Sequence, residues 1–381
     1  MFLKTANLII YVYLAMCGCM LIFNIVAVLW RKRSFRVDKH RCHQWSGVLE
    51  KAAEGGDIKD DLTAMLPAPL RPFLGRRSES QLLEWLLGRL SSLNAFQMEL
   101  EWRLPRPEGE ALRRWLKNHK SVFAALSERY YRKDDTVKAY YAYLMGLFRL
   151  AGPAEYDPVT RELLLMVTSN SIYLRENALA GLYASGNVDM VMRGLVRMAE
   201  AGIRHSGKLI TDGLLTFQGD KDALADGLWA AWDRFPATYQ TAFVNYLRMS
   251  SGAFTERFLP LLTNEGTDRE VRLALLRYYR RYPYPPVQPV LLRFMDESNR
   301  EGWEFSALAA LAASTLEKYP GEDTVEALAK ALRHRNWYVR SNAAEAILKV
   351  APDHPLIESV LKGPDPYARD ILAYKRGALA Q

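Results

Sequence analysis

Apolar residues recur at intervals of three and four along much of the chain, with polar residues between them. The clearest such segments are residues 158–168, 190–201, 223–232, 254–262, 287–296 and 324–333. This spacing is typical of amphipathic helices that are buried on one face. No segment sustains a two-residue alternation, and turn-forming sequences such as ASGN, NEGTD and YPGED separate the helices. The pattern therefore predicts an all-α protein.

A second set of predicted helices lies between these segments and shares a short motif. In RNWYVRSNAAEAILKV, residues 335–350, Arg340 follows Tyr-Val and precedes Ala343. Similar sequences surround other arginines, often with an aspartate four residues earlier, and weaker copies carry a different residue at the arginine position. The series of these anchor positions is Lys138, Arg175, Lys208, Gln240, Arg272, Ser306, Arg340 and Arg369.

The anchor positions are almost evenly spaced. Successive steps along the series are 37, 33, 32, 32, 34, 34 and 29 residues. A period in this range, with two helices per unit, is the signature of a helical solenoid in which each unit packs only on its neighbours. The alanines near Arg340 would allow one helical hairpin to approach the next closely. We therefore expect about eight stacked hairpins in residues 125–381.

These units resemble the HEAT repeat, and most closely the short bacterial type found in phycobilisome-lyase-like proteins. The resemblance is clear at residues 170–182, 268–279, 336–348 and 365–374. It implies a right-handed α-solenoid of the armadillo-like kind, in which the arginine and aspartate of each unit are structural and tie neighbouring units together. The residues to which this inter-repeat role would transfer are Arg175, Arg272, Arg340, Arg369, Asp134, Asp268 and Asp365.

The segment before the repeats has a different pattern. Residues 46–124 contain amphipathic stretches such as QLLEWLLGRLSSLNAFQMELEWRL but do not match the anchor series. The terminal unit of a helical array must present one polar outer face. We therefore expect residues 46–124 to form an atypical helical cap.

Residues Leu8–Trp30 contain no charged side chain. As a helix these residues would rise roughly 35 Å, enough to cross a bilayer. A lipoprotein signal at MCGC is an alternative, although apolar residues continue beyond it. Basic residues concentrate after the apolar stretch, which favours a cytoplasmic location for the rest of the chain. The sequence thus predicts a single-pass membrane anchor (1–30) and a basic juxtamembrane tether (31–45), with the N-terminus outside and the large domain cytoplasmic.

The formal net charge of +8 is concentrated near the N-terminus. Residues 1–43 contain seven Lys or Arg against one Asp, which leaves a net charge of +2 for the remaining residues. A nucleic-acid-binding domain usually carries a basic patch of its own. The near-neutral large domain therefore argues against nucleic acid as a partner.

The residue types needed for catalysis do not form a recognisable set. All three cysteines, Cys17, Cys19 and Cys42, lie in the first 43 residues, which removes thiol chemistry from the large domain. His40, Cys42 and His43 could hold a metal, but neighbouring positive charges oppose it. No phosphate-binding glycine loop and no nucleophile elbow is present. We expect no catalytic residues, no metal and no cofactor.

The most suggestive surface sequence is RYYRRYPYPP, residues 277–286. Arginine, tyrosine and tryptophan are enriched at protein interfaces. The alternative is that the tyrosines pack in the core, that the arginines are solvated, and that Trp337 packs between helices. The partner-binding candidates are Arg277, Tyr278, Arg280, Arg281, Tyr282, Tyr284 and Trp337.

Two functions are compatible with these features. The first is a membrane-anchored scaffold or adaptor that binds a protein partner at the cytoplasmic membrane face, such as a polysaccharide glycosyltransferase or a signalling protein. The second is an enzyme or a ligand or nucleic-acid binder built on helical repeats, as in lyase subunits or HEAT-like DNA glycosylases. The lack of a convergent catalytic set favours the scaffold.

Overall fold

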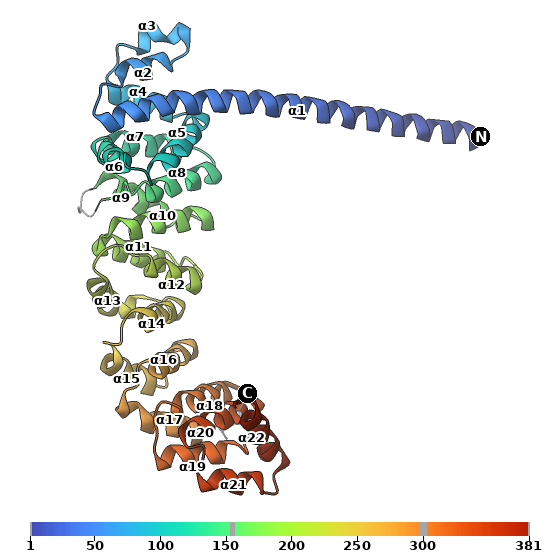
Figure 1. Cartoon of the computed structure of the whole chain (residues 1–381), viewed down its shortest axis with the longest axis vertical. Helices are drawn as coiled ribbons and strands as arrows, with labels where there is room; N and C mark the ends of the chain where they lie inside the picture. Colours follow the sequence, from blue (N-terminus) through green and yellow to red (C-terminus); the bar gives the residue numbers. More distant parts are fainter. Residues whose placement is uncertain (1, 153–156, 297–302, 380–381) are drawn as a thin grey trace. The chain divides into compact units, whose positions relative to one another are not determined.

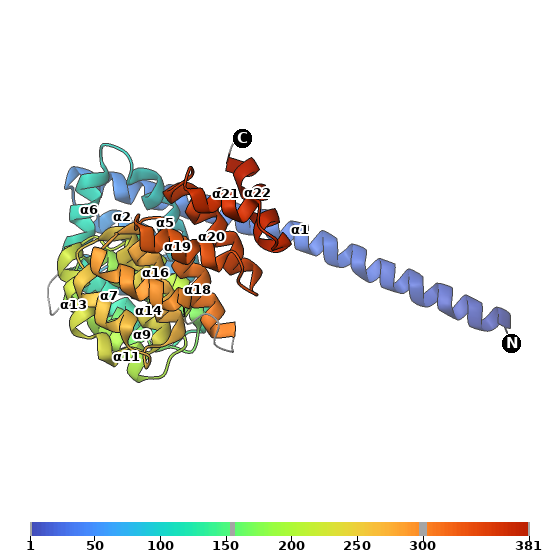
Figure 2. The same ribbon diagram turned by 90° about the horizontal axis from the view of Figure 1, so that it is seen from below.

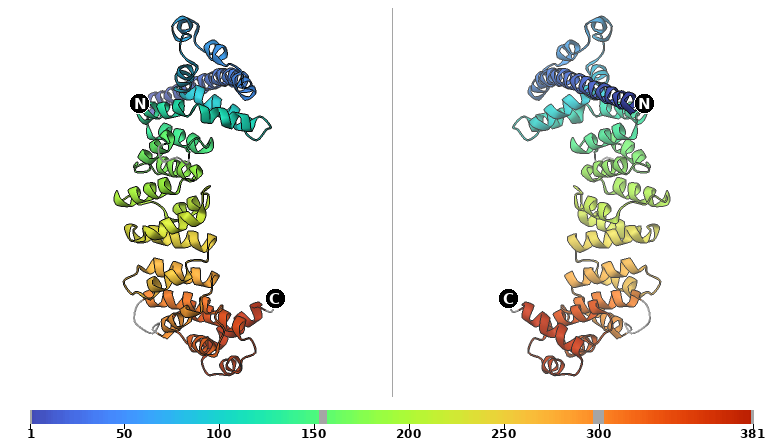
Figure 3. Two further views of the ribbon diagram at one scale, coloured as in Figure 1. Left: turned by 90° about the vertical axis from the view of Figure 1, so that its left-hand side faces the viewer. Right: turned by 90° about the vertical axis from the view of Figure 1, so that its right-hand side faces the viewer.

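The computed structural model of the chain describes residues 2–152, 157–296 and 303–379, with side chains left aside at 2–15, 27–38, 303–305 and 379. Every secondary-structure element in these ranges is a helix, so the predicted all-α class is confirmed. Contacts divide the chain into two compact units, Met1–Ser185 and Gly186–Gln381. Figure 3 shows helices stacked one on the next within each unit.

Unit 1 begins with one long helix and continues as packed shorter helices (Figure 1). The carboxyl-terminal part of α1 packs against α5 and α6, α7 packs against α9, and α8 packs against α10. Trp45 of α1 is fully buried, with its ring edge-on to Phe96. The helices are α1 (Phe2–Glu54), α2 (Lys59–Ala64), α3 (Arg71–Leu74), α4 (Glu79–Leu87), α5 (Leu90–Arg103), α6 (Gly109–Asn118), α7 (Lys120–Tyr131), α8 (Asp135–Leu147), α9 (Pro158–Met166) and α10 (Ile172–Ser185).

Unit 2 consists of two layers of helices. The even-numbered helices from α12 to α22 pack side by side in sequence, and odd-numbered helices such as α17, α19 and α21 pack on one another in the second layer. The helices are α11 (Val188–Glu200), α12 (Gly207–Leu215), α13 (Lys221–Ala230), α14 (Ala237–Ser250), α15 (Thr255–Thr263), α16 (Arg269–Arg281), α17 (Gln288–Asp296), α18 (Trp303–Leu316), α19 (Glu322–Ala331), α20 (Trp337–Val350), α21 (Pro355–Leu361) and α22 (Pro366–Leu379).

The anchor positions coincide with one layer of this arrangement. Each of them lies in the first turn of an even-numbered helix, from Lys138 in α8 to Arg369 in α22. Small residues allow these helices to approach closely: a Cβ on Gly146 of α8 would lie 3.3 Å from the backbone of Gly181 in α10. Ala343 and Ala344 of α20 are completely buried. The chain therefore has the helical, repeat-like architecture that the spacing predicts.

The amino-terminal half of α1 extends beyond the other helices of its unit, as both Figure 1 and Figure 2 show. Among the residues that the structure describes, no helix has a stretch both long and apolar enough to cross a membrane. A spanning helix needs about 20 predominantly apolar residues. The predicted single-pass membrane localisation, with an outside N-terminus and a cytoplasmic large domain, is therefore wrong on this finding. The basic side chains at 31–36 lie outside the described residues.

Candidate partner-binding surface

Two tyrosines of the predicted binding sequence belong to the core. Tyr278 and Tyr279 of α16 are completely buried. The Tyr278 hydroxyl donates to the carbonyl of Ser251 at 3.0 Å and accepts from the amide of Phe254 at 3.1 Å. Burial raises the pKa of Tyr278 to about 12. Tyr278 therefore holds the loop before α15 against α16 and presents no surface to a partner.

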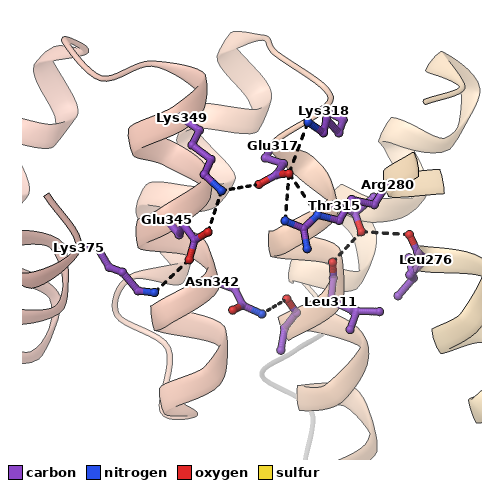
Figure 4. A network of polar contacts seen from close by, with 11 residues as sticks. Leu276, Arg280, Leu311, Thr315, Glu317, Lys318, Asn342, Glu345, Lys349 and Lys375 are labelled. Atoms are coloured by element: carbon purple, nitrogen blue, oxygen red, sulfur yellow. Dashed lines mark hydrogen bonds and ion pairs between the residues drawn. The ribbon is translucent and has the colours of Figure 1, made fainter. Parts of the chain in front are cut away.

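Arg280 belongs to a chain of ion pairs that joins successive even-numbered helices (Figure 4). Its guanidinium Nη2 lies 3.0 Å from Glu317, whose second oxygen lies 3.2 Å from Lys349 of α20. Lys349 also contacts Glu345 at 2.7 Å, and Glu345 contacts Lys375 of α22 at 3.0 Å. Arg280 is thus a structural residue, because its charge is already paired.

The two carboxylates of this network are held ionised. Burial alone would raise the pKa of Glu317, but hydrogen bonds and positive charges from Arg280 and Lys349 outweigh burial and lower it. Hydrogen bonds from Lys349 and Lys375 lower the pKa of Glu345 to about 2. A carboxylate with several cationic partners is more strongly ionised than one facing water alone. The network therefore keeps its charges at neutral pH.

The remaining residues of the sequence 277–286 divide into two groups. Arg277 and Arg281 are exposed, and no carboxylate pairs with either within the described parts of the chain. Tyr282 is half-buried, with its ring 5.1 Å from that of Tyr278, and the amide of Tyr284 donates to the hydroxyl of Tyr319 at 3.1 Å. Of this sequence, only Arg277 and Arg281 remain available to a ligand as unpaired charges.

Trp337 lies on a separate, exposed aromatic surface at the start of α20. Trp337 is 53% exposed and Tyr338 is 67% exposed, and their rings meet edge-to-face at 5.2 Å. On the next even-numbered helix, Tyr367 is 69% exposed, and the guanidinium of Arg340 lies 5.5 Å from its ring centre. We call Trp337, Tyr338 and Tyr367 the aromatic patch.

The conformation of α20 is fixed locally, which positions this patch. The side chain of Asn336 accepts a hydrogen bond from the amide of Tyr338 at 2.8 Å and so caps the helix. Arg340 Nη1 donates to the carbonyls of His334 and Arg335 at 2.7 and 3.0 Å, in the turn before the helix. The aromatic side chains therefore stand on a well-supported helix start.

The anchor arginines and aspartates bond mainly within their own hairpin. Arg175 Nη1 donates to the carbonyls of Ser169 and Asn170 at 2.7 and 3.0 Å, as Arg340 does to its own turn. Contacts with the next hairpin include ring contacts, such as the guanidinium of Arg272 lying 4.9 Å from the Phe294 ring centre. The aspartates are helix caps, accepting backbone amides: Asp134 in α8, Asp268 in α16 and Asp365 in α22. Arg369 lies 3.5 Å from Asp370 of its own helix.

Direct ties between neighbouring helices come from residues that sequence reasoning missed. Asn177 donates to the carbonyl of Ala139 in α8 at 2.8 Å, and Asn342 donates to that of Ala310 in α18 at 2.7 Å. Both asparagines lie two residues after an anchor arginine, in RENA and RSNA. That shared motif was visible in the sequence and could have identified them.

Two surface grooves lie in unit 2. One, with a volume of 740 Å³, runs between α17 and α19 and has both acidic and basic residues in its walls, including the ion pair of Asp296 and Lys330 at 2.6 Å. The other, of 540 Å³, runs along α14 and is bordered by α12 and the start of α16. In the described part of the chain, no three His, Cys, Asp or Glu side chains come together as a metal site would require.

The chain resembles a solved structure only weakly. No protein-family model matches it, and neither does any curated protein. A crystal structure of an engineered protein matches with a TM-score of 0.35 and 13% sequence identity, over 90% of this chain and 96% of that one. Two chains with so low a TM-score need not share a fold.

Proposed function

We propose that this protein is a scaffold of the HEAT type, in which about eight helical hairpins form a right-handed solenoid, and that it binds a protein partner through the aromatic patch. The anchor residues in the first turns of successive packed helices support the HEAT assignment. The arginines that bond the preceding turn support it as well.

The exposure of Trp337, Tyr338 and Tyr367 is the observation that carries the proposed binding role. Most large aromatic side chains of the described core are buried, as Tyr239, Tyr246 and Phe243 of α14 are. Three exposed aromatics in the first turns of two helices that pack on each other offer rigid apolar surface at little cost in side-chain entropy. Tyrosine and tryptophan dominate the energetics of protein interfaces.

Site-specific photocrosslinking tests the proposal. Benzoylphenylalanine placed at Tyr338 should yield a discrete crosslinked protein in the cells that make this chain. Tyr173 of α10 provides the matched control, because it is 79% exposed and lies two residues before its anchor arginine, as Tyr338 does. The same probe at Tyr173 should not yield that species.

The crosslink should also depend on the rest of the patch. Replacing Trp337 and Tyr367 by alanine should abolish the species formed from position 338. No discrete species from position 338, or an equal one from position 173, would contradict partner binding at the aromatic patch. A crosslinked species that disappears after nuclease treatment would replace the protein partner by nucleic acid.

A further inference from the structure

Three arginines without carboxylate partners gather where α14 and α16 end. Arg248 lies near the end of α14, and Arg277 and Arg281 lie one turn apart near the end of α16. Within the described residues, none of the three has an ion pair. Like charges four residues apart on a helix repel one another. Arg280 lies on the same helix as Arg277 and Arg281 but differs from them, because it is paired with Glu317.

The side chain of Arg248 is half-buried in addition to lacking an ion pair in the described chain. Its Nε atom is buried and lacks a hydrogen-bond partner among the described residues. Burial lowers the pKa of its guanidinium, and the positive charges of Arg277 and Arg281 lower it further. A buried donor without an acceptor costs free energy, and a bound water or ligand that supplies the acceptor would recover it.

A second unsatisfied group lies along the same groove. Thr241, Asn245 and Arg248 occupy positions i, i+4 and i+7 of α14, so they form one stripe on the wall of the 540 Å³ groove. The hydroxyl of Thr241 is buried without a hydrogen-bond partner in the described structure. The stripe is about 10 Å long, which corresponds to about three residues of extended peptide.

The acidic residues of the groove are occupied elsewhere. Asp212 pairs with Lys208 at 2.5 Å, the side chain of Asp268 caps α16, and Glu270 pairs with Arg269. None of these carboxylates contacts the three arginines. A negative charge for the cluster must therefore come from a ligand if the cluster is to be neutralised.

We infer that the groove along α14 binds an extended acidic peptide segment, whose carboxylate contacts Arg248 in the groove wall and the nearby Arg277 and Arg281 beyond it. Thr241 and Asn245 provide the hydroxyl and amide groups that pair with a peptide main chain, and Ala237, Ala242 and Met249 provide apolar contacts. A peptide fits better than a polyanion such as nucleic acid, because residues 44–381 carry a net charge of only +2. This site is independent of the aromatic patch.

Fluorescence anisotropy on the full chain tests this site. The probe is a fluorescein-labelled peptide of alternating Asp and Glu, at physiological ionic strength. Arg248→Gln combined with Arg281→Gln should weaken its binding by about tenfold or more, since two charge-assisted contacts are lost. The charge-matched control is Arg234→Gln combined with Arg257→Gln, two exposed arginines already paired with Glu200 and Asp226.

Stability provides a readout that a merely structural role would not reproduce. Because Arg281 repels Arg248 in the free protein, Arg281→Gln should leave Tm unchanged or raise it while it weakens peptide binding. Equal loss of binding in the control pair would overturn the inference. Competition by inorganic phosphate as strong as that by the peptide would also overturn it, since the cluster would then be a simple anion site. A lowered Tm in Arg281→Gln would overturn it as well.

Discussion

At the scale of single residues, the tyrosines of this protein differ in burial and therefore in role. Tyr278 and Tyr338 both stand beside arginines, yet the first is buried and the second exposed. Helical periodicity could have distinguished them, because Leu275, Tyr278 and Tyr279 have the i, i+3, i+4 spacing of a buried stripe. Trp337 and Tyr338 are followed three and four residues later by polar residues, so they do not belong to a buried stripe of this kind.

The role of the anchor arginines was predicted as structural, and the geometry shows how they bond. The hydrogen bonds of Arg175 and Arg340 reach the turn of their own hairpin, and Arg340 also contacts the next hairpin through the ring of Tyr367. The partner of a long side chain depends on the turn conformation, which spacing between repeats does not encode. The asparagine two residues later is the residue that crosses to the neighbouring helix.

Arg340→Ala should lower the free energy of unfolding by about 1–3 kcal/mol, because two hydrogen bonds from a charged group are lost. Arg369→Ala is the matched control. Arg369 holds the same anchor position, but its only ion pair in the described structure is a 3.5 Å contact with the neighbouring Asp370. Urea unfolding of both variants measures the difference. Equal losses would show that the turn hydrogen bonds contribute nothing.

At the scale of helices, the periodic pattern predicted which helices exist better than it predicted where they end or which side chains join neighbouring helices. The six amphipathic segments predicted between the anchor helices appear as α9, α11, α13, α15, α17 and α19, close to their predicted positions. α1 was expected as separate segments because its composition changes from apolar to basic to amphipathic. No proline interrupts residues 1–54, so the helix continues through those changes.

The ion-pair network of Figure 4 also acts between helices and was not predicted. The pairs that join different helices are separated by about one repeat period, as Glu317 and Lys349 are by 32 residues. Pairing between side chains so far apart becomes recognisable only when the stacking register is known. Once the register is known, Glu317, Glu345 and Lys349 can be recognised as charged neighbours at successive even-numbered helices.

Glu345→Gln should make stability less dependent on acid. The folded pKa of Glu345 is about 2, below its ordinary value of 4.5. Its carboxylate therefore stabilises the fold above pH 4.5, and this contribution is lost as the pH falls toward 2. The urea midpoint of the parent should fall more between neutral pH and this range than that of the variant.

Glu326→Gln provides the control for this effect, because Glu326 is exposed on α19 and has no ion pair in the described residues. It should show the same pH dependence as the parent. If Glu345→Gln also matched the parent over the whole range, the network would make no contribution to the stacking of α20 and α22.

At the scale of the whole molecule, the repeat spacing predicted stacked helices but not the two units into which their contacts fall. The step from Arg175 to Lys208 is 33 residues, like the others, although the boundary between units lies within it. The boundary lies at Gly186, which has a left-handed φ of 71°. Periodicity reports the spacing of elements, and packing decides how strongly neighbours are coupled.

The structure also changes where function is expected on the molecule. Most residues of the repeat motif cap helices, bond turns or fill the core, whereas Trp337, Tyr338 and Tyr367 expose most of their side chains. Stacked repeats create extended binding surfaces, and exposed aromatic side chains on them are free to contact a partner. The partner binding that we propose is therefore located at the aromatic patch rather than at Tyr278 and Arg280.

The most direct measurement compares partner affinity and Tm in the triple variant Trp337→Ala, Tyr338→Ala and Tyr367→Ala, with the protein identified by crosslinking as the ligand. Large exposed anchors contribute to binding far more than to folding, so affinity should fall by about a hundredfold while unfolding changes by about 0.5 kcal/mol or less. The control Tyr173→Ala should change neither quantity. Unchanged affinity in the triple variant would contradict the central claim that this protein binds its partner through the aromatic patch.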